Sequence, residues 1–152
     1  MAEKRDRPYG QFNFLVKIGD QDGKKFPDAA FQEVTGLGTE ITVAEYRSGN
    51  YALNSPMKIT GTYKVPDVTL KRGVFGELEL LHAWMRDVRD KGQYFRKTVV
   101  IQLQREDHTG PVQAWILKDA RPIKYTGPAL SAKGTDVAIE ELVLSCETID
   151  IE

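Results

Sequence analysis

Few residues in this sequence have the types and spacing that catalysis or metal binding requires. The chain has two histidines, His82 and His108, and one cysteine, Cys146. None of them falls in a spacing typical of a metal site, such as HxxxH or CxxC. His82 lies beside the apolar stripe of a predicted helix, and His108 lies in a predicted turn. Cys146 lies on the apolar side of a predicted strand, where a buried and unreactive thiol is expected.

The carboxylates and glycines form no catalytic or nucleotide-binding motif either. Glu140 and Glu141 are neighbours on a predicted strand, so their side chains point to opposite faces and cannot act as an acid–base pair. The glycine pairs at 36–38 and 73–76 lack the spacing of a phosphate-binding loop or a dinucleotide-binding fingerprint. We therefore expect no catalytic residue, no cofactor and no metal, and the sequence predicts a protein that is not an enzyme.

Length and composition limit the remaining classes. The 152 residues predict one domain over 9–152, preceded by a charged, flexible N-terminal arm at 1–8. Lys and Arg total 21 and Asp and Glu total 22, a net charge of −1, which argues against a dedicated DNA-binding domain. A single cysteine forms no internal disulfide, so we expect folding in a reducing cytoplasm. No apolar run reaches the ~18 residues that a membrane span requires.

Hydrophobic periodicity predicts the elements that would position any site. Period-two alternation predicts strands at 12–18, 30–34, 40–46, 57–65, near 68–70, at 99–104, 112–118 and 136–149, with a Pro- and Gly-punctuated stretch at 121–134. A helical stripe predicts one helix at about 76–91, formed by Leu78, Leu81, Trp84, Met85 and Val88. This pattern is typical of a mainly β fold, an antiparallel β-sandwich or barrel with one α-helix. Trp84 and Trp115 are expected in its core.

Two of these segments indicate how the faces and edges of the sheet are used. The strand at 57–65 is expected to place Lys58, Thr60, Thr62 and Lys64 together on one face, opposite Met57, Ile59, Tyr63 and Val65. The long final strand has an apolar face and a mixed face, which favours neighbours on more than one side. Closing a sheet across subunits would remove its exposed edge, and an ordinary sandwich accounts for the pattern nearly as well.

The segment 47–56 is longer than most connections between strands. It contains turn-forming residues, yet also Tyr51 and Leu53. Long loops that carry aromatic and aliphatic side chains are more often functional than incidental. We therefore expect this loop to make contacts.

Ordered segments over about residues 8–150 resemble the tail-tube proteins of contractile phage tails and of extracellular contractile injection systems. The segments are Tyr9-Gly10 leading into FNFLVKIGD, then FQEVTGLGTEITVAEYRSGN, MKITGTYKVPDVTLKRGVF, LHAWMRDV, and VVIQLQREDHTGPVQAWILKDARPIKYTGPALSAKGTDVAIEELVLSCETI. No single segment is diagnostic, and their order and spacing carry the resemblance.

The resemblance implies a structural protomer of an inner tube. Such proteins form hexameric rings in which strands of the subunits complete one barrel around a lumen, and the rings stack. The implied partners are further copies of the chain, a contractile sheath, and baseplate and spike components. Cargo or DNA would pass through the lumen without specific binding, and no membrane is involved. The protein would fold in the bacterial cytoplasm and end in a virion tail or an extracellular injection particle.

The resemblance also gives the loop at 47–56 a role. It resembles the extended loop that bridges one ring to the next, with Tyr46, Arg47, Asn50 and Tyr51 as the candidate contacts. A solvated hairpin loop is the alternative at this position. At the level of the whole chain, the alternatives are a baseplate-proximal tube initiator of the same fold and a monomeric β-sandwich binding module. Phage tail, extracellular particle and type VI-like machine all fit the resemblance.

Overall fold

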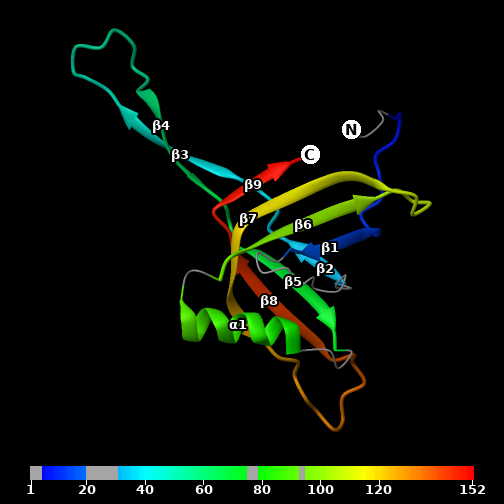
Figure 1. The fold of residues 1–152 in the computed structure, drawn as a ribbon. Helices are drawn as coiled ribbons and strands as arrows, with labels where there is room; N and C mark the ends of the chain where they lie inside the picture. The colour runs from blue at the N-terminus through cyan, green and yellow to red at the C-terminus, as the bar shows by residue number, and fades with distance from the viewer. Residues whose placement is uncertain (1–4, 20–30, 75–78, 93–94) are drawn as a thin grey trace.

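The computed structural model describes residues 5–19, 31–74, 79–92 and 95–152. Nine strands and one helix occur in these described ranges (Figure 1). They are β1 (Phe14–Ile18), β2 (Glu33–Thr35), β3 (Glu40–Tyr46), β4 (Met57–Lys64), β5 (Val68–Gly73), α1 (Glu79–Lys91), β6 (Lys97–Gln104), β7 (Pro111–Thr126), β8 (Ile139–Ser145) and β9 (Thr148–Ile151). All strand pairs are antiparallel. The predicted mainly β fold with one helix is confirmed.

The long strand β7 belongs to two sheets. Its first half pairs with β6 on one edge and with β9 on the other, and β1 pairs with β6. Its second half pairs with β8, which is followed by β5 and β2. The four-stranded sheet β1-β6-β7-β9 and the sheet β7-β8-β5-β2 therefore share one strand.

The bend between the two sheets lies at Asp119 of β7. Two steps along β6, from Lys97 to Val99, match three steps along β7, from Ala120 to Leu117, so β7 carries one extra residue there. Asp119 has a φ of 55°, in the left-handed region that is uncommon for residues other than glycine. The predicted strand at 112–118 was too short, because β7 continues past the bulge at Asp119 to Thr126, into the stretch that the sequence analysis described as punctuated by Pro and Gly.

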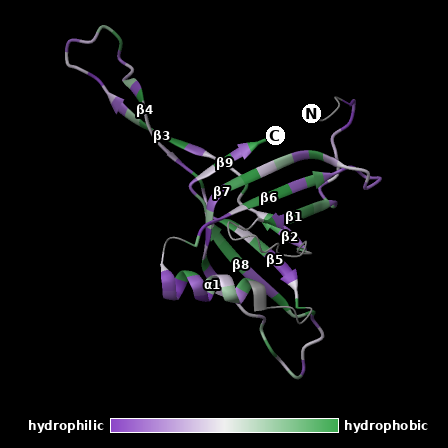
Figure 2. Cartoon of the chain, viewed as in Figure 1, coloured by the Kyte–Doolittle hydropathy of each residue, from purple (hydrophilic) through white to green (hydrophobic). Residues whose placement is uncertain are grey.

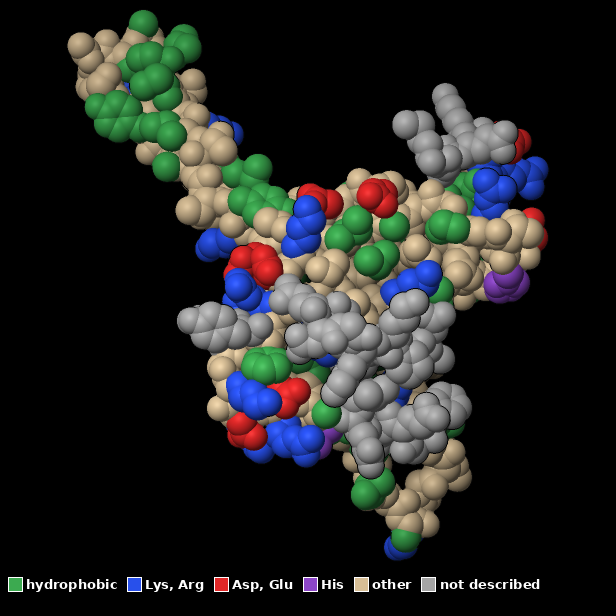
Figure 3. All heavy atoms as spheres, viewed as in Figure 1, with side chains coloured by type: hydrophobic (Ala, Val, Ile, Leu, Met, Phe, Trp, Pro, Cys, Tyr) green, Lys and Arg blue, Asp and Glu red, His purple; other side chains and the backbone are tan. Residues whose placement is uncertain are grey.

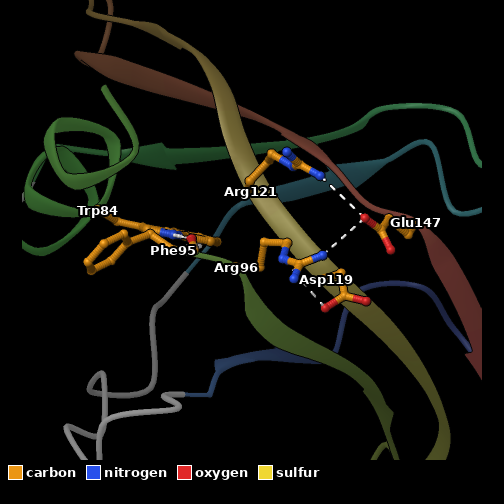
Figure 4. Close-up of polar contacts among 6 residues, drawn as sticks. All are labelled: Trp84, Phe95, Arg96, Asp119, Arg121 and Glu147. Atoms are coloured by element: carbon orange, nitrogen blue, oxygen red, sulfur yellow. Dashed lines mark hydrogen bonds and ion pairs between the residues drawn. The ribbon is translucent and has the colours of Figure 1, made fainter. Parts of the chain in front are cut away.

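Ion pairs surround this bend (Figure 4). The Glu147 carboxylate lies 3.3 Å from the guanidinium groups of both Arg96 and Arg121, and Arg96 is also 4.0 Å from Asp119. Glu147 lies where the predicted final strand is interrupted, so the strand expected at 136–149 is two strands, β8 and β9. Both run along β7, with Ser145 opposite Arg121 and Thr148 opposite Lys118.

The core lies between the two sheets and the helix. Figure 2 shows hydrophobic residues along the strands that enclose it, and its buried members are Val16, Ile18, Val68, Leu70, Leu81, Trp84, Val99, Ile101, Leu117, Ala120, Leu142, Leu144, Cys146 and Ile149. Trp84 of α1 is 1% exposed and its indole N–H donates to the Phe95 carbonyl at 2.9 Å (Figure 4). Trp115 is half-buried against this core. The predicted start of the helix at 76–78 and the strand residue Ala30 lie outside the described residues.

A buried ion pair links two neighbouring strands of the sheet β7-β8-β5-β2. Arg72 of β5 and Glu140 of β8 are directly opposed, and the Arg72 guanidinium donates to the Glu140 carboxylate. The hydroxyl of Tyr125 donates to the other oxygen of Glu140 at 2.8 Å. The side chain of Glu140 is 2% exposed, so these donors replace the water it loses. Glu141 points to the other face, as the alternation predicted.

A two-stranded ribbon leaves the body of the molecule. The pairs β2–β5 and β3–β4 follow one another along the same two chain segments, and only the first pair is joined to β8. Between the pairs, Gly36 has a φ of +91° and approaches Asp67 so closely that a Cβ would lie 2.2 Å from the Asp67 carbonyl oxygen. We call this close approach of Gly36 and Asp67 the crossing. Next to it, Pro66 has no N–H with which to continue the hydrogen bonding between the two chain segments. Beyond it, β3 and β4 form a separate sheet that projects from the body (Figure 1).

Candidate functional site

The projecting hairpin β3–β4 exposes apolar side chains that a folded chain normally buries. All eight residues of β4 are exposed. Seven large apolar side chains of the hairpin and its loop are 41–59% exposed: Ile41, Val43, Tyr46, Leu53, Met57, Ile59 and Tyr63. Figure 3 shows hydrophobic side chains gathered on the visible face of the projection. A two-stranded hairpin is marginally stable in water by itself. A contiguous exposed apolar surface of this kind is typical of a site of interaction with another molecule.

A β-bulge divides the hairpin into two halves. Ile41 is opposite Tyr63, whereas Val43 is opposite Thr60, so β4 carries one extra residue between these pairs. The extra residue is accommodated at Gly61 and Thr62, which face Thr42. Glycine suits this position because a Cβ there would lie 2.6 Å from the Thr42 hydroxyl oxygen and 2.9 Å from the Thr42 backbone oxygen.

The bulge puts the exposed apolar side chains on opposite faces of the hairpin. Opposed residues share a face, and faces alternate along a strand. One face therefore carries Ile41, Val43 and Tyr63 near the body, which we name the base patch. The other face carries Ala44, Tyr46, Met57 and Ile59 near the loop, which we name the tip patch.

The predicted faces of the strand at 57–65 are therefore wrong. Tyr63 lies on the face opposite to Ile59, and Lys58 and Thr60 lie on the face opposite to Thr62 and Lys64. The alternation was extrapolated through Gly61, where the extra residue reverses it. The four polar side chains do not form one continuous face.

The loop at 47–56 is organised by Arg47. Its Nε donates to the Leu53 carbonyl at 3.0 Å, and its Nη2 donates to the Tyr51 carbonyl at 3.3 Å. A turn hydrogen bond from the Tyr51 N–H to the Ser48 carbonyl, 3.1 Å long, tightens the loop further. The guanidinium therefore holds the backbone of the loop, a role that the sequence did not indicate.

The other three predicted contacts occupy the end of the hairpin. Tyr46 is 55% exposed and belongs to the tip patch, Asn50 is exposed, and Tyr51 is half-buried. The structure thus brings Tyr46, Arg47, Asn50 and Tyr51 together at one end of the projection. Their role as contacts stays a prediction. Sequence analysis missed Val43 and Ile59, whose alternation also fits a buried strand; the isolated Gly61 within the strand was the available signal of a bulge.

The residues whose side chains could take part in catalysis or metal binding, His82, His108 and Cys146, do not lie together in one site. His82 is exposed on α1, its ring 6.3 Å from that of Tyr125, and His108 lies in the β6–β7 turn with a φ of 59°. Burial, together with the carboxylate of Asp67, raises the pKa of the Cys146 thiol, which disfavours the nucleophilic thiolate. Among the described residues, no three His, Cys, Asp or Glu side chains are placed to share a metal ion. No helix in the described part of the chain has the length and apolarity to cross a membrane.

The fold, together with a projecting hairpin that exposes apolar side chains, is typical of a subunit that assembles with other molecules. The chain belongs to the family of the T4-like virus tail tube protein gp19, which matches residues 10–150. It is therefore a tail tube protein.

Solved structures are similar over nearly the whole chain. A chain of the extracellular contractile injection system PVC, in its sheath–tube complex in the extended state, is 25% identical with a TM-score of 0.83, covering 97% of this chain and 93% of that one. A chain of the anti-feeding prophage baseplate is 25% identical with a TM-score of 0.85, covering 97% of both chains.

More distant structures share the fold. Hcp1 from Flavobacterium johnsoniae is 15% identical with a TM-score of 0.53, over 91% of this chain and 93% of that one. No curated protein shows significant sequence similarity to the chain.

Proposed function

We propose that this tail tube protein is the protomer of a stacked, hexameric inner tube that conducts cargo or DNA. The observation that carries the proposal is the β3–β4 hairpin, which projects from the body with its apolar side chains exposed. Another copy of the chain is the partner that a tube subunit always has available. Burying the tip patch against a neighbouring ring would remove this apolar surface from water.

The end of the hairpin bridges one ring to the next in this proposal. Tyr46 and Tyr51 supply aromatic surface, which contributes strongly at protein interfaces. Asn50 supplies polar groups for hydrogen bonds. Arg47 positions the loop through its bonds to Tyr51 and Leu53 rather than by contacting the neighbour itself.

The similar solved structures support the remaining partners. The PVC structure is a sheath–tube complex, and the anti-feeding prophage baseplate structure is six-fold symmetrised. We accordingly propose six subunits per ring, a contractile sheath around the tube, and a baseplate with spike components at its end. The protein would fold in the bacterial cytoplasm and reach its final place as part of the particle.

The tube would act as a conduit and not as an enzyme. His82, His108 and Cys146 lie on different elements, and the one thiol is buried. A net charge of −1 gives the chain no excess of positive charge that would retain nucleic acid during passage.

Electron microscopy of the purified chain tests the proposal. Negative-stain images and light scattering over a range of protein concentrations should show rings and tubes with a central lumen. Compact monomers at every concentration would overturn it in favour of a monomeric binding module.

A baseplate-proximal tube initiator is the second candidate, supported by the similarity to a chain of the anti-feeding prophage baseplate. An initiator would stop at one ring, whereas a main tube protein adds ring upon ring. The length distribution of the assemblies in the same images separates the two roles.

A further inference from the structure

Outside the β3–β4 hairpin, the exposed apolar side chains gather near one loop. Six large apolar side chains of the described residues are exposed outside the hairpin, and four of them lie in the loop at 127–138 or in the strands that flank it: Ile123, Leu130, Val137 and Ile139. Leu130 is 87% exposed and Val137 is 76% exposed, the highest values among the large apolar side chains that the structure describes. Keeping these side chains in water is unfavourable, so a partner that covers them would gain free energy.

The loop at 127–138, which we call the β7–β8 loop, is a defined projection. At its end the Ala138 carbonyl accepts from the Val74 N–H at 3.0 Å, which ties the loop to the segment after β5. A turn hydrogen bond from the Gly134 N–H to the Ser131 carbonyl, 3.1 Å long, tightens its middle. Figure 1 shows the β7–β8 loop and the β3–β4 hairpin at opposite ends of the molecule.

The β7–β8 loop and the end of the hairpin both carry few charges. In the whole chain 28% of the residues are charged. The β7–β8 loop has two charged residues in twelve, Lys133 and Asp136. The loop at 47–56 has one in ten, Arg47, whose guanidinium donates to carbonyls of its own loop. Few charges beside exposed apolar side chains are typical of the centre of a protein–protein interface.

The two surfaces differ in side-chain size. The end of the hairpin presents large exposed side chains: Tyr46, Leu53, Met57 and Ile59. The β7–β8 loop presents small exposed residues around Leu130: Ala129, Ser131, Ala132 and Gly134. Small residues leave room beside Leu130 for the larger side chains of a partner, which favours a closely packed contact.

A stack of rings needs two different surfaces. If the hairpin ends of two rings contacted each other, the contact would be two-fold symmetric and the stack would end at two rings. A tube that grows ring by ring therefore requires each hairpin to dock on another surface, at the opposite end of the neighbouring subunit. The β7–β8 loop supplies exposed apolar surface at that end (Figure 1).

We propose that the β7–β8 loop receives the end of the hairpin from a subunit of the adjoining ring, with Leu130 and Val137 packed against the tip patch. This proposal rests on the proposed tube function and names the second surface of the ring-to-ring contact. Each subunit then donates its hairpin to one neighbouring ring and accepts a hairpin from the other.

Two charged variants test the contact. The acceptor variant is Leu130→Asp/Val137→Asp, and the hairpin variant is Tyr46→Asp/Leu53→Asp. An unpaired carboxylate is costly to bury, so each variant should form rings that no longer stack, as counted in negative-stain images. The matched control is Phe12→Asp, at an apolar side chain that is 71% exposed and belongs to neither surface. It should form tubes of wild-type length.

Mixing the two variants tests whether their surfaces form one contact. Rings of each variant are assembled separately and then combined. The acceptor variant keeps its hairpins and the hairpin variant keeps its β7–β8 loops, so one ring of each can join. Pairs of rings should appear that neither sample forms alone, and stacks of three should stay absent. If the aspartates prevent ring formation, serines at the same positions serve for the same comparison.

Tubes of wild-type length in the acceptor variant would overturn the role of the β7–β8 loop and leave the tube function intact. A mixture that contains single rings alone would also overturn it, because the two surfaces would then not complement each other. A loss of stacking in Phe12→Asp as large as in the acceptor variant would have the same meaning. An absence of rings and tubes in the wild type would overturn both this contact and the proposed function.

Discussion

Gly61 of β4 lies so close to Thr42 of β3 that no residue with a side chain fits at position 61 without a shift of the backbone. A Cβ at Gly61 would lie 2.9 Å from the Thr42 backbone oxygen. This contact fixes the bulge, and the bulge places the base patch and the tip patch on opposite faces. The distribution of apolar surface along the hairpin thus depends on one missing methyl group.

Gly61→Ala should disrupt assembly without unfolding the protomer. The added carbon forces the backbone of the hairpin to shift, so the two patches no longer have their native orientation. Because the hairpin lies outside the core, we expect the free energy of unfolding to change by less than about 1 kcal/mol. A loss of about 1.4 kcal/mol per subunit contact would raise the protein concentration needed for tubes roughly tenfold. Light scattering measures this concentration, and Gly110→Ala, in the β6–β7 turn with open space at its Cβ, is the matched control. Unchanged tube formation would contradict the role of the bulge.

Arg47→Ala should weaken ring stacking through the loop. The substitution removes the bonds to the Tyr51 and Leu53 carbonyls, so Tyr51 loses its fixed position. We expect single rings to persist while long tubes become rare, and Tyr51→Ala to have the same effect. Arg105→Ala, at an exposed arginine in the β6–β7 turn, is the control. Tubes of wild-type length in both loop variants would refute the stacking assignment.

Glu140→Leu should destabilise the body of the protomer. The change removes the carboxylate that accepts from Arg72 and from Tyr125 in a buried setting. Breaking a buried ion pair on one side costs about 3–5 kcal/mol. The double variant Arg72→Met/Glu140→Leu should recover part of that loss, because both charges are then absent. Urea unfolding at concentrations below assembly measures these differences, and a double variant weaker than the single one would contradict the account.

Stability should decline at alkaline pH. Burial raises the pKa of Cys146 above its ordinary value of 9.0, and burial with the bond to Glu140 raises that of Tyr125 above 10.0. The unfolded chain therefore releases these protons first, so the contribution is full below pH ~9 and is lost as pH rises through the raised values. Cys146→Ala should flatten the fall of the unfolding free energy as the pH rises above 9.0, the ordinary pKa of the thiol. An equally steep fall in this variant would exclude the thiol as its source.

The sequence predicted elements whose periodicity is local, and failed where long-range pairing decides. The strands at 40–46 and 57–65 and the helix that buries Trp84 follow from alternation and from a single stripe. The length of β7 does not follow from such a local pattern. The residues near Pro122 have a composition typical of loops, but their pairing with β8 keeps them in the strand. The exposure of the β3–β4 hairpin could not be predicted from the sequence either. A strand shows the same alternation of apolar residues whether its apolar face packs against the same chain or against another chain.

The crossing of Gly36 and Asp67 has a mechanical consequence. Only two chain segments join the hairpin to the body, and no ladder to β8 or β9 stiffens them beyond that point in the described residues. Beyond the crossing, the described contact of the arm with β9 is the hydrogen bonding of the Tyr63 hydroxyl with Ile149. Because few contacts hold the arm, we expect a change in its angle to cost less free energy than a change in the packing of the core. In a tube built from such subunits, we expect bending to be taken up first at these arms and only afterwards in the packed cores.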